Sequence, residues 1–430
     1  MRTRKDIKGF LPLVLIMFGV LFTACHHHDD PDPVPEERVA QQTILMYMPW
    51  AGGGSIYNAC LKNITAMKTA IEYRGGLGQK RVVVFIASTA NRAYLIDLKY
   101  ENGSCKNDTL KTYTTLSGNN YTTASGLTAL FSDVITLAKA NSYGMVVSAH
   151  GMGWLPAGES AGLAKGAAAW PMDDSAASSQ QSASPRYAPK SPVGVYRVDR
   201  DIETRFIGTP VGGDTSFQTD ITVFGDAVQT TFRHLDFLLF DDCHMQNIEV
   251  AYALKDITDY IIGSTSEVMM VGLPYTTVGG HLLDADYVAV VKDFYDFFID
   301  YKDPYGTLSV VKTREVQALA DLMKQANTHQ GGSTVDINDV QYLDGFAPTI
   351  FFDMGSYINR LCADDEALRS QLQTQLSRVV VAAAHTPMFY SVVNKSEMII
   401  REFSGITISD PSTAVAARSK TQTLWWQATH

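Results

Sequence analysis

The stretch Met145-Val146-Val147-Ser148-Ala149-His150-Gly151 places an apolar β-strand directly before a histidine and a glycine. A second stretch, Phe237-Leu238-Leu239-Phe240-Asp241-Asp242-Cys243, places another apolar strand before two aspartates and a cysteine. In an open parallel sheet the carboxyl ends of the strands share one edge, where crevices bind ligands. We therefore expect His150 and Cys243 to approach each other at that edge.

Short apolar runs alternate with helical patterns from about residue 41 onward. Strands are expected at 43–49, 81–88, 144–149, 236–240 and 259–264, with helices between most of them. This alternation predicts an α/β fold with right-handed crossovers and a mainly parallel sheet flanked by helices. The pattern resumes after residue 282, so we expect a first domain over 41–282 and a C-terminal α/β region over 283–430 packed on it.

The periodicity breaks down between residues 156 and 220. Residues 161–184 are rich in Ala, Ser and Gly, which is typical of a long exposed loop. Loops of this length are usually functional or disordered. We interpret 156–220 as a loop insertion in the first domain.

The composition limits the class of protein. Of 430 residues, 46% are hydrophobic and 19% charged, so the chain can bury a large core. The formal charge of −10 argues against nucleic-acid binding, which needs a basic face. Five cysteines are too few for a disulfide scaffold, and their odd number leaves at least one thiol unpaired.

The first 24 residues have the features of an export signal. Basic residues precede the apolar run Phe10–Phe22, which is too short to span a bilayer, and Cys25 follows. The pattern resembles a bacterial lipoprotein signal, although Phe22 stands where the strict motif has leucine. We expect Cys25 to be lipidated, 25–40 to form a tether, and the protein to attach to a membrane of the bacterial cell envelope (outer membrane, periplasmic face or cell surface); ordinary secretion is the alternative.

A thiol and an imidazole at one sheet edge suit nucleophilic catalysis. The thiolate is the nucleophile, and a nearby imidazole activates it or protonates the leaving group. A helical pattern after Cys243 would add a helix N-terminus that stabilises the thiolate. The amide of Gly151 could approach an oxyanion without obstruction by a side chain. The alternative is a buried free cysteine behind a strand and an unrelated histidine.

These motifs resemble those of the clostripain family of cysteine peptidases. The similarity includes hydrophobic-His-Gly at His150, hydrophobic-Asp-x-Cys at Cys243, the helix-like 245–254 (MQNIEVAYAL), and 262–275 with its closing Gly-x-Pro-Tyr. It covers most of 41–428. The resemblance implies a caspase-like fold, a catalytic domain over 41–282, and an endopeptidase that acts on proteins or peptides.

The resemblance also implies residue roles. Cys243 would be the nucleophile, His150 the general acid/base, and the amides of Gly151 and Cys243 the oxyanion hole. Asp241 matches a position that lines the S1 pocket and pairs with a substrate Arg or Lys; its alternative role is to cap the following helix. Some family members carry a second acid in the next loop, whereas residues 268–273 (VMMVGL) contain none. The S1 pocket is therefore expected to hold one negative charge instead of two.

Some clostripain-like proteins cut themselves at a basic residue between the histidine and the cysteine. Lys165 lies closest to the matching place, so it is a candidate processing site. The alternative is a solvated loop with ordinary basic residues.

Some family members use calcium, but nothing in the sequence localises a calcium site. No other cofactor is expected, and no His/Cys/Asp cluster has zinc spacing.

Two other functions compete with the peptidase. The first is a catalytically silent surface protein of the same fold that binds peptides or glycans. The second is a serine esterase, because Gly158-Glu159-Ser160-Ala161-Gly162 matches the G-x-S-x-G motif. That motif needs an apolar strand before the serine and a helix after it, and neither is expected around Ser160. A monomer is expected.

Overall fold

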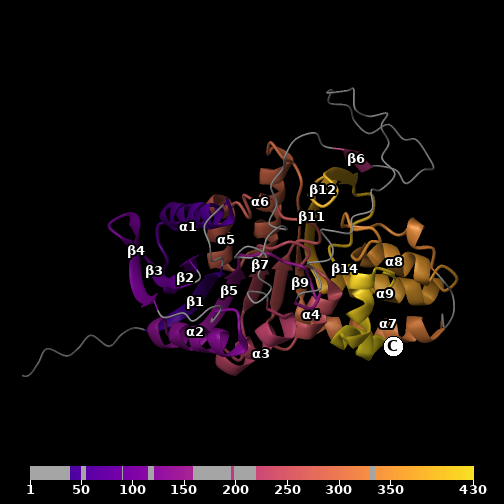
Figure 1. Cartoon of the computed structure of the whole chain (residues 1–430), viewed down its shortest axis with the longest axis horizontal. Helices are drawn as coiled ribbons and strands as arrows, with labels where there is room; N and C mark the ends of the chain where they lie inside the picture. The colour runs from indigo at the N-terminus through magenta and orange to yellow at the C-terminus, as the bar shows by residue number, and fades with distance from the viewer. Residues whose placement is uncertain are drawn as a thin grey trace, which may run out of the picture. The chain divides into compact units, whose positions relative to one another are not determined.

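A computed structural model describes residues 39–49, 55–89, 91–114, 121–157, 195–197, 219–329 and 335–430. Val39–His430 form one compact unit. Its centre is a nine-stranded sheet of order β11-β9-β8-β7-β5-β1-β2-β3-β4 (Figure 1). The strands are β1 (Ala40–Met48), β2 (Lys80–Thr89), β3 (Arg92–Glu101), β4 (Ser104–Tyr113), β5 (Ala140–Val147), β7 (Phe237–Phe240), β8 (Tyr260–Gly263), β9 (Thr307–Lys312) and β11 (Val380–His385).

The middle of the sheet is parallel. The run β2-β1-β5-β7-β8 pairs in parallel throughout, whereas β3, β4, β9 and β11 add antiparallel pairs at the two sides. Helices cover both faces, as Figure 1 shows. The predicted α/β fold with a mainly parallel sheet is therefore confirmed. One face carries α1 (Ser55–Tyr73), α5 (Tyr275–Asp284) and α6 (Tyr287–Ile299); the other carries α2 (Ala124–Leu137), α3 (Ile221–Thr231) and α4 (Ile248–Leu254).

Alternating side chains of the strands feed two hydrophobic cores. In β1, Ile44, Met46 and Met48 pack into the core beneath α1, α5 and α6, whereas Leu45 and Tyr47 pack into the core beneath α2 and α3. Successive residues of a strand point to opposite faces, and a sheet covered on both sides buries both sets. This explains why the central strands read as continuous apolar runs in the sequence.

The chain after residue 282 shares the main sheet, because β9 and β11 pair with it and with each other. The other elements pack around the end of the sheet that carries these two strands (Figure 1). They are α7 (Val316–His329), β10 (Phe352–Asp353), α8 (Met354–Leu361), α9 (Glu366–Val379), β12 (Met388–Ser391), β13 (Ser396–Ile399), β14 (Thr407–Ile408), α10 (Leu424–Thr429) and short 3-10 turns at Thr313–Glu315, Ile337–Asp339 and Val415–Gln422. In the part of the chain that the structure describes, no helix is both long and apolar enough to cross a membrane.

Candidate active site

His150 and Cys243 follow neighbouring strands at one edge of the sheet. Strands β5 and β7 pair in parallel with Val147 opposite Phe240, and the amide of Asp241 donates to the carbonyl of Val147 at 2.8 Å. The segments that follow β5 and β7 therefore leave the sheet at the same level and in the same direction. This is the juxtaposition that the two apolar strands predict.

The backbone of Gly151 touches the backbone of Cys243. A Cβ atom built on Gly151 would lie 2.2 Å from the carbonyl oxygen of Cys243, which no real contact allows. The loop continues along the same path, since a Cβ on Gly153 would lie 2.6 Å from Nδ2 of Asn247. Asp242 closes the contact by accepting a hydrogen bond from the amide of Ala149. The segment around His150 and the segment around Cys243 thus form one packed unit.

Replacing Gly151 with alanine should disable this unit. The added methyl has no space against the Cys243 carbonyl, so the backbone of one loop must move, and a displacement near 1 Å costs about 100-fold in rate. We expect peptide hydrolysis to fall by about 100-fold or more. Gly280→Ala is the matched control, because a Cβ there meets nothing within 4 Å. Equal kcat/KM for Gly151→Ala and Gly280→Ala would contradict the close approach.

The thiol of Cys243 is fully buried and receives a backbone hydrogen bond. The amide of Val268 donates to Sγ at 3.2 Å, while the Val268 carbonyl lies 4.0 Å from Sγ. The expectation of a helix N-terminus at the cysteine is wrong, because α4 begins only at Ile248 and is capped by Asn247. The amide that contacts the sulfur comes instead from the loop that follows β8. A donor in this position favours the thiolate over the thiol.

Asp241 lies beneath the same loop. Its side chain has no exposed surface and accepts hydrogen bonds from the amide of Leu273 at 3.1 Å, the hydroxyl of Tyr275 at 2.9 Å and the hydroxyl of Ser148 at 3.4 Å. Hydrogen bonds of this kind stabilise the charged form of a carboxyl group. The alternative role, capping the next helix, is wrong because Asn247 caps α4.

His244 has a structural environment although it adjoins Cys243. Its backbone is left-handed, with φ of 56°, and its ring stacks on Phe351 at 5.0 Å between centroids. Burial lowers the pKa of His244 to about 4, so the ring is neutral at physiological pH.

Buried carboxyl groups lie between helix α4 and the C-terminal segment. Oε1 of Glu249 accepts from the amide of Ser409 at 2.7 Å, and Trp425 donates to Asp410 at 3.3 Å. Burial, with the nearby Asp410 charge, raises the pKa of Glu249 to about 8, and burial raises the pKa of Asp410 to about 7. Lys420 donates to the carbonyls of Asp410 and Ser412. Its positive charge lowers the pKa of both carboxyl groups but only partly offsets the increase caused by burial.

Glu249 should make the fold less stable as the pH rises. A carboxyl whose pKa is higher in the folded than in the unfolded chain stabilises the fold below about pH 4.5, and that contribution is lost as the pH passes about 8. We expect the drop in Tm between pH 5.5 and pH 8.5, measured by differential scanning fluorimetry, to be smaller in Glu249→Gln than in wild type. The difference should be about 2 °C for each kcal/mol by which the titration of Glu249 changes the free energy of unfolding. Exposed Glu366→Gln is the control. An unchanged drop in Glu249→Gln would refute the assignment.

The other candidate residues of the sequence and the other cysteines fall into two groups. Cys25, Ser160 and Lys165 lie outside the described residues. Cys60, Cys105 and Cys362 are buried free thiols; burial raises the pKa of Cys105 to about 11 and also raises the pKa of Cys362, which suits inert groups. Within the described ranges, no group of three or more His, Cys, Asp or Glu side chains could hold a metal ion.

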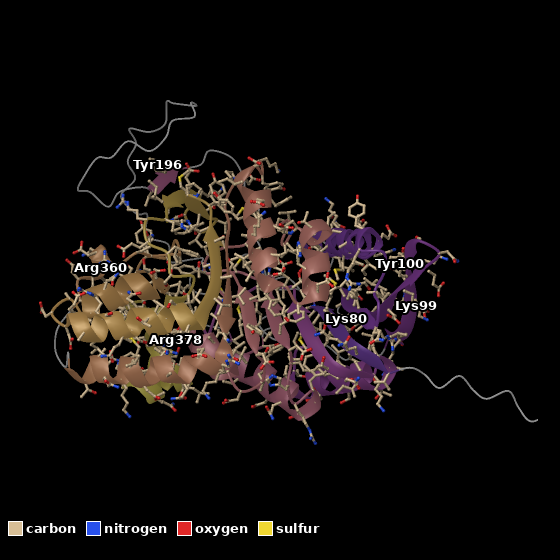
Figure 2. The ribbon with its side chains drawn as sticks, turned by 180° about the vertical axis from the view of Figure 1, so that it is seen from behind. Lys80, Lys99, Tyr100, Tyr196, Arg360 and Arg378 are labelled. Atoms are coloured by element: carbon tan, nitrogen blue, oxygen red, sulfur yellow. The ribbon has the colours of Figure 1, made fainter. Side chains whose placement is uncertain are left out.

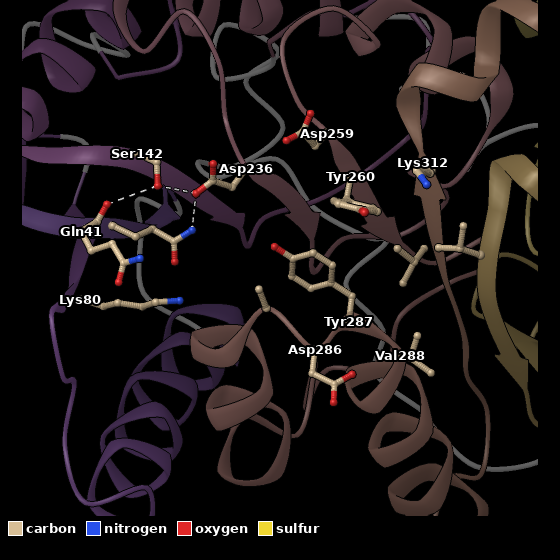
Figure 3. Close-up of a pocket in the computed structure, with 14 residues that line it drawn as sticks. Gln41, Lys80, Ser142, Asp236, Asp259, Tyr260, Asp286, Tyr287, Val288 and Lys312 are labelled. Atoms are coloured by element: carbon tan, nitrogen blue, oxygen red, sulfur yellow. Dashed lines mark hydrogen bonds between the residues drawn. The ribbon is translucent and has the colours of Figure 1, made fainter.

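A cavity of about 710 Å³ opens at the opposite edge of the sheet (Figure 3). It is lined at the starts of β1, β5 and β8 and includes Lys80, Asp236 and Tyr287. Asp236 accepts hydrogen bonds from Gln42 at 2.5 Å and Ser142 at 2.6 Å, which tie together the strands at this edge. The cavity is therefore separate from the edge that carries His150 and Cys243.

Several residues of the candidate site could not be predicted from the sequence. Asp242 holds the loop before His150, Val268 contacts the sulfur, and Tyr275 and Ser148 hold Asp241. Asp242 is signalled only by its place beside Cys243. Val268 carries no signal because its backbone, and not its side chain, makes the contact.

Comparison with known proteins establishes the class. The fold matches that of cysteine-type endopeptidases: a secreted C11 cysteine protease from Bacteroides thetaiotaomicron, "iotapain", is 36% identical over 91% of this chain and 99% of its own, with a TM-score of 0.76. A clostripain from B. thetaiotaomicron ATCC 29148, in complex with the peptide inhibitor BTN-VLTK-AOMK, is 44% identical over 51% of this chain and 98% of its own, with a TM-score of 0.50.

A more distant structure shares the fold. An inactive zymogen C11 protease from Parabacteroides distasonis is 24% identical over 91% of this chain and 99% of its own, with a TM-score of 0.70. The family model described as "Clostripain family" matches residues 194–415. The chain belongs to the clostripain family of cysteine peptidases, as the resemblance of its motifs indicates. Comparison with curated proteins gave no match.

Proposed function

We propose that this endopeptidase uses Cys243 as its nucleophile and His150 as its general acid/base. The thiolate of Cys243 attacks the scissile carbonyl and forms a C–S bond, and the oxyanion receives hydrogen bonds from the amides of Gly151 and Cys243. His150 gives a proton to the departing amine as the C–N bond breaks. Water, deprotonated by His150, then hydrolyses the thioester and restores the thiol.

The observation that carries this proposal is the contact between Gly151 and Cys243. Only 2.2 Å would separate a Cβ on Gly151 from the carbonyl oxygen of Cys243, so the histidine loop lies directly against the cysteine loop. The Val268 amide on Sγ adds support, because it stabilises the ionised nucleophile. An unrelated histidine and a merely buried thiol would need neither feature.

We place a basic residue at the P1 position of the substrate. Asp241 lies two residues before the nucleophile, and its carboxylate accepts hydrogen bonds from Leu273, Tyr275 and Ser148, which stabilise the charged form. A guanidinium or ammonium needs such a partner when it leaves water. The inhibitor bound to the related clostripain, BTN-VLTK-AOMK, has lysine as the last residue of its peptide. The loop 268–273 supplies no second acid, so Asp241 carries the preference alone.

The nucleophile must become accessible before it can act. Cys243 has no exposed surface, whereas a peptide carbonyl must come within bonding distance of Sγ. Cleavage within 156–220, with Lys165 as the candidate site, is the proposed opening step. Wild-type protein that cleaves peptides at full rate while its own chain stays intact would exclude this step.

The proposed location is the cell envelope. Residues 1–24 would direct export and Cys25 would carry the lipid, with 25–40 as the tether. The description of the related "iotapain" as secreted supports export. Partners are protein or peptide substrates and the membrane that holds the lipid, and the working unit is a monomer.

The test of the catalytic proposal is hydrolysis of fluorogenic peptides that differ only at P1. Wild-type protein and Cys243→Ala are compared on Arg, Lys, Ala, Leu and Asp peptides. Hydrolysis of the Arg and Lys peptides that disappears in Cys243→Ala supports both the nucleophile and the basic preference. Equal hydrolysis by the two proteins would refute the nucleophile.

A further inference from the structure

Glu267 joins the loop beside Cys243 to a hairpin far along the chain. Its side chain is 2% exposed, and Oε1 accepts hydrogen bonds from the hydroxyl of Ser391 at 2.7 Å and the amide of Val392 at 3.0 Å. The second oxygen also receives the Val392 amide, at 3.2 Å. Ser391 is the last residue of β12, so Glu267 fixes its own loop to the β12–β13 hairpin.

The residues on either side of Glu267 hold the segment that contains Cys243. The carbonyl of Ser266 accepts the amide of His244 at 3.0 Å, and the amide of Val268 donates to Sγ of Cys243 at 3.2 Å. Three consecutive residues therefore connect the hairpin on one side with the nucleophile on the other. A shift of Glu267 would move the Val268 amide relative to the sulfur.

The hairpin is a firm support for this connection. Phe389 and Met398 pack in a small core with Val195 of β6 (Val195–Arg197), which adds a third strand beside β13. Tyr305 donates to Glu397 of β13 at 2.5 Å. Figure 2 shows Tyr196 of β6 at the outer end of this assembly. Because the hairpin is packed and β13 is paired on both sides, Glu267 is held against a fixed element.

We infer that Glu267 is a positioning residue that aims the Val268 amide at the sulfur of Cys243 and thereby sets how readily the thiol ionises. The inference rests on the proposed role of Cys243. A hydrogen bond to the charged form of a group favours ionisation, and this effect is lost when donor and acceptor separate. Glu267 thus serves the reaction without touching the substrate.

The charge of Glu267 must be separated from its anchoring role. Removing a negative charge near a thiol favours the thiolate, whereas losing the Val268 hydrogen bond disfavours it. Glu267→Gln and Glu267→Ala remove the same charge, but the glutamine Oε1 can still accept from Ser391 and Val392. The difference between these two variants therefore reports the anchor alone. The titratable groups on the packed segments, namely His150, Asp241, Asp242, His244 and Asp344, are the same in both. Asp344 is included because burial, with the charge of Glu267, raises its pKa to about 7.

The experiment follows the 13Cβ chemical shift of Cys243 between pH 5 and pH 10 in the full chain, labelled with 13C at the Cβ atoms of cysteine and assigned by comparison with Cys243→Ala; it needs no reagent to reach the buried sulfur. We expect the midpoint of the titration to lie about one pH unit higher in Glu267→Ala than in Glu267→Gln, a tenfold smaller thiolate fraction at low pH. Ser391→Ala, which removes one of the contacts and perturbs the fold less, should lie between them. Superimposable profiles for Glu267→Ala and Glu267→Gln would overturn the inference.

Asp353→Ala provides the matched control for loss of stability. Asp353 is also buried, and it accepts hydrogen bonds from the amides of Ser356 at 2.8 Å and Ser404 at 2.6 Å, which lie outside the loops around Cys243. It should lower Tm as Glu267→Ala does but leave the titration of Cys243 as in wild type. An equal shift in Asp353→Ala would show a general loss of packing and overturn the positioning role. The titration does not require turnover, so activity retained in Cys243→Ala would refute the proposed nucleophile, whereas equal titrations in Glu267→Ala and Glu267→Gln would refute the role of Glu267.

Discussion

Cys243→Ala is expected to lower kcat/KM for a peptide with Lys at P1 by at least about 10⁴-fold, to the limit of detection. Without the sulfur no acyl-enzyme can form, and the amides of Gly151 and residue 243 have no bound nucleophile to assist. The fold should be kept, because alanine fits the space that the buried cysteine occupies. Initial rates of fluorogenic peptide hydrolysis, with Tm as a check on folding, measure this effect.

Two control variants make the loss specific. Cys60→Ala removes another fully buried free thiol, on α1, and should retain wild-type kcat/KM. Ser160→Ala should also retain it, because the esterase interpretation alone requires that serine. Activity that survives in Cys243→Ala and disappears in Ser160→Ala would replace the cysteine mechanism with a serine mechanism. Wild-type protein inactive on every peptide would favour a peptide- or glycan-binding role.

Asp241→Asn is expected to lower kcat/KM for Arg and Lys peptides by about 100-fold and to leave a Leu peptide within about threefold. The change keeps the size of the side chain and removes the charge that a buried cation requires, which costs about 2–5 kcal/mol when one partner is lost. The amide of Leu273 and the hydroxyl of Tyr275 can still donate to the asparagine oxygen. The ratio of the Lys rate to the Leu rate is therefore the decisive quantity.

Tyr275→Phe distinguishes charge from architecture at the same place. It removes one donor to Asp241 but leaves the carboxylate, so the Lys/Leu ratio should stay within about tenfold of wild type. If Asp241→Asn lowers hydrolysis of Lys and Leu peptides equally, Asp241 supports the loop and does not select the substrate. Specificity would then have to come from residues 268–273.

The parallel sheet could be predicted because its strands are short, apolar and regularly separated by helical patterns. The same reasoning brings His150 and Cys243 to one edge, since strands β5 and β7 end just before them. Gly151 could be singled out as a residue whose amide an oxyanion can approach without obstruction, whereas its close contact with the backbone of Cys243 is not predicted by the sequence and is seen only in the structure. These features depend on local patterns and on general rules of strand topology.

The remaining contacts depend on loops that are distant in sequence. The helical pattern predicts that α4 starts immediately after Cys243, but residues 244–247 form an irregular connection in which His244 has a left-handed backbone and Asn247 caps the helix. The donor to the sulfur is a backbone amide 25 residues away, and the anchor of its loop lies 124 residues beyond Glu267. Backbone donors and long-range anchors leave no pattern in a single sequence.

The central claim is that Cys243 and His150 hydrolyse peptides with a basic residue at P1. The most direct test compares wild-type protein with Cys243→Ala in the rate of hydrolysis of the Arg, Lys, Ala, Leu and Asp peptides. We predict that wild-type protein cleaves the Arg and Lys peptides at least about tenfold faster than the other peptides, and that Cys243→Ala cleaves none of them. Hydrolysis of the Lys peptide at the same rate by both proteins would contradict it.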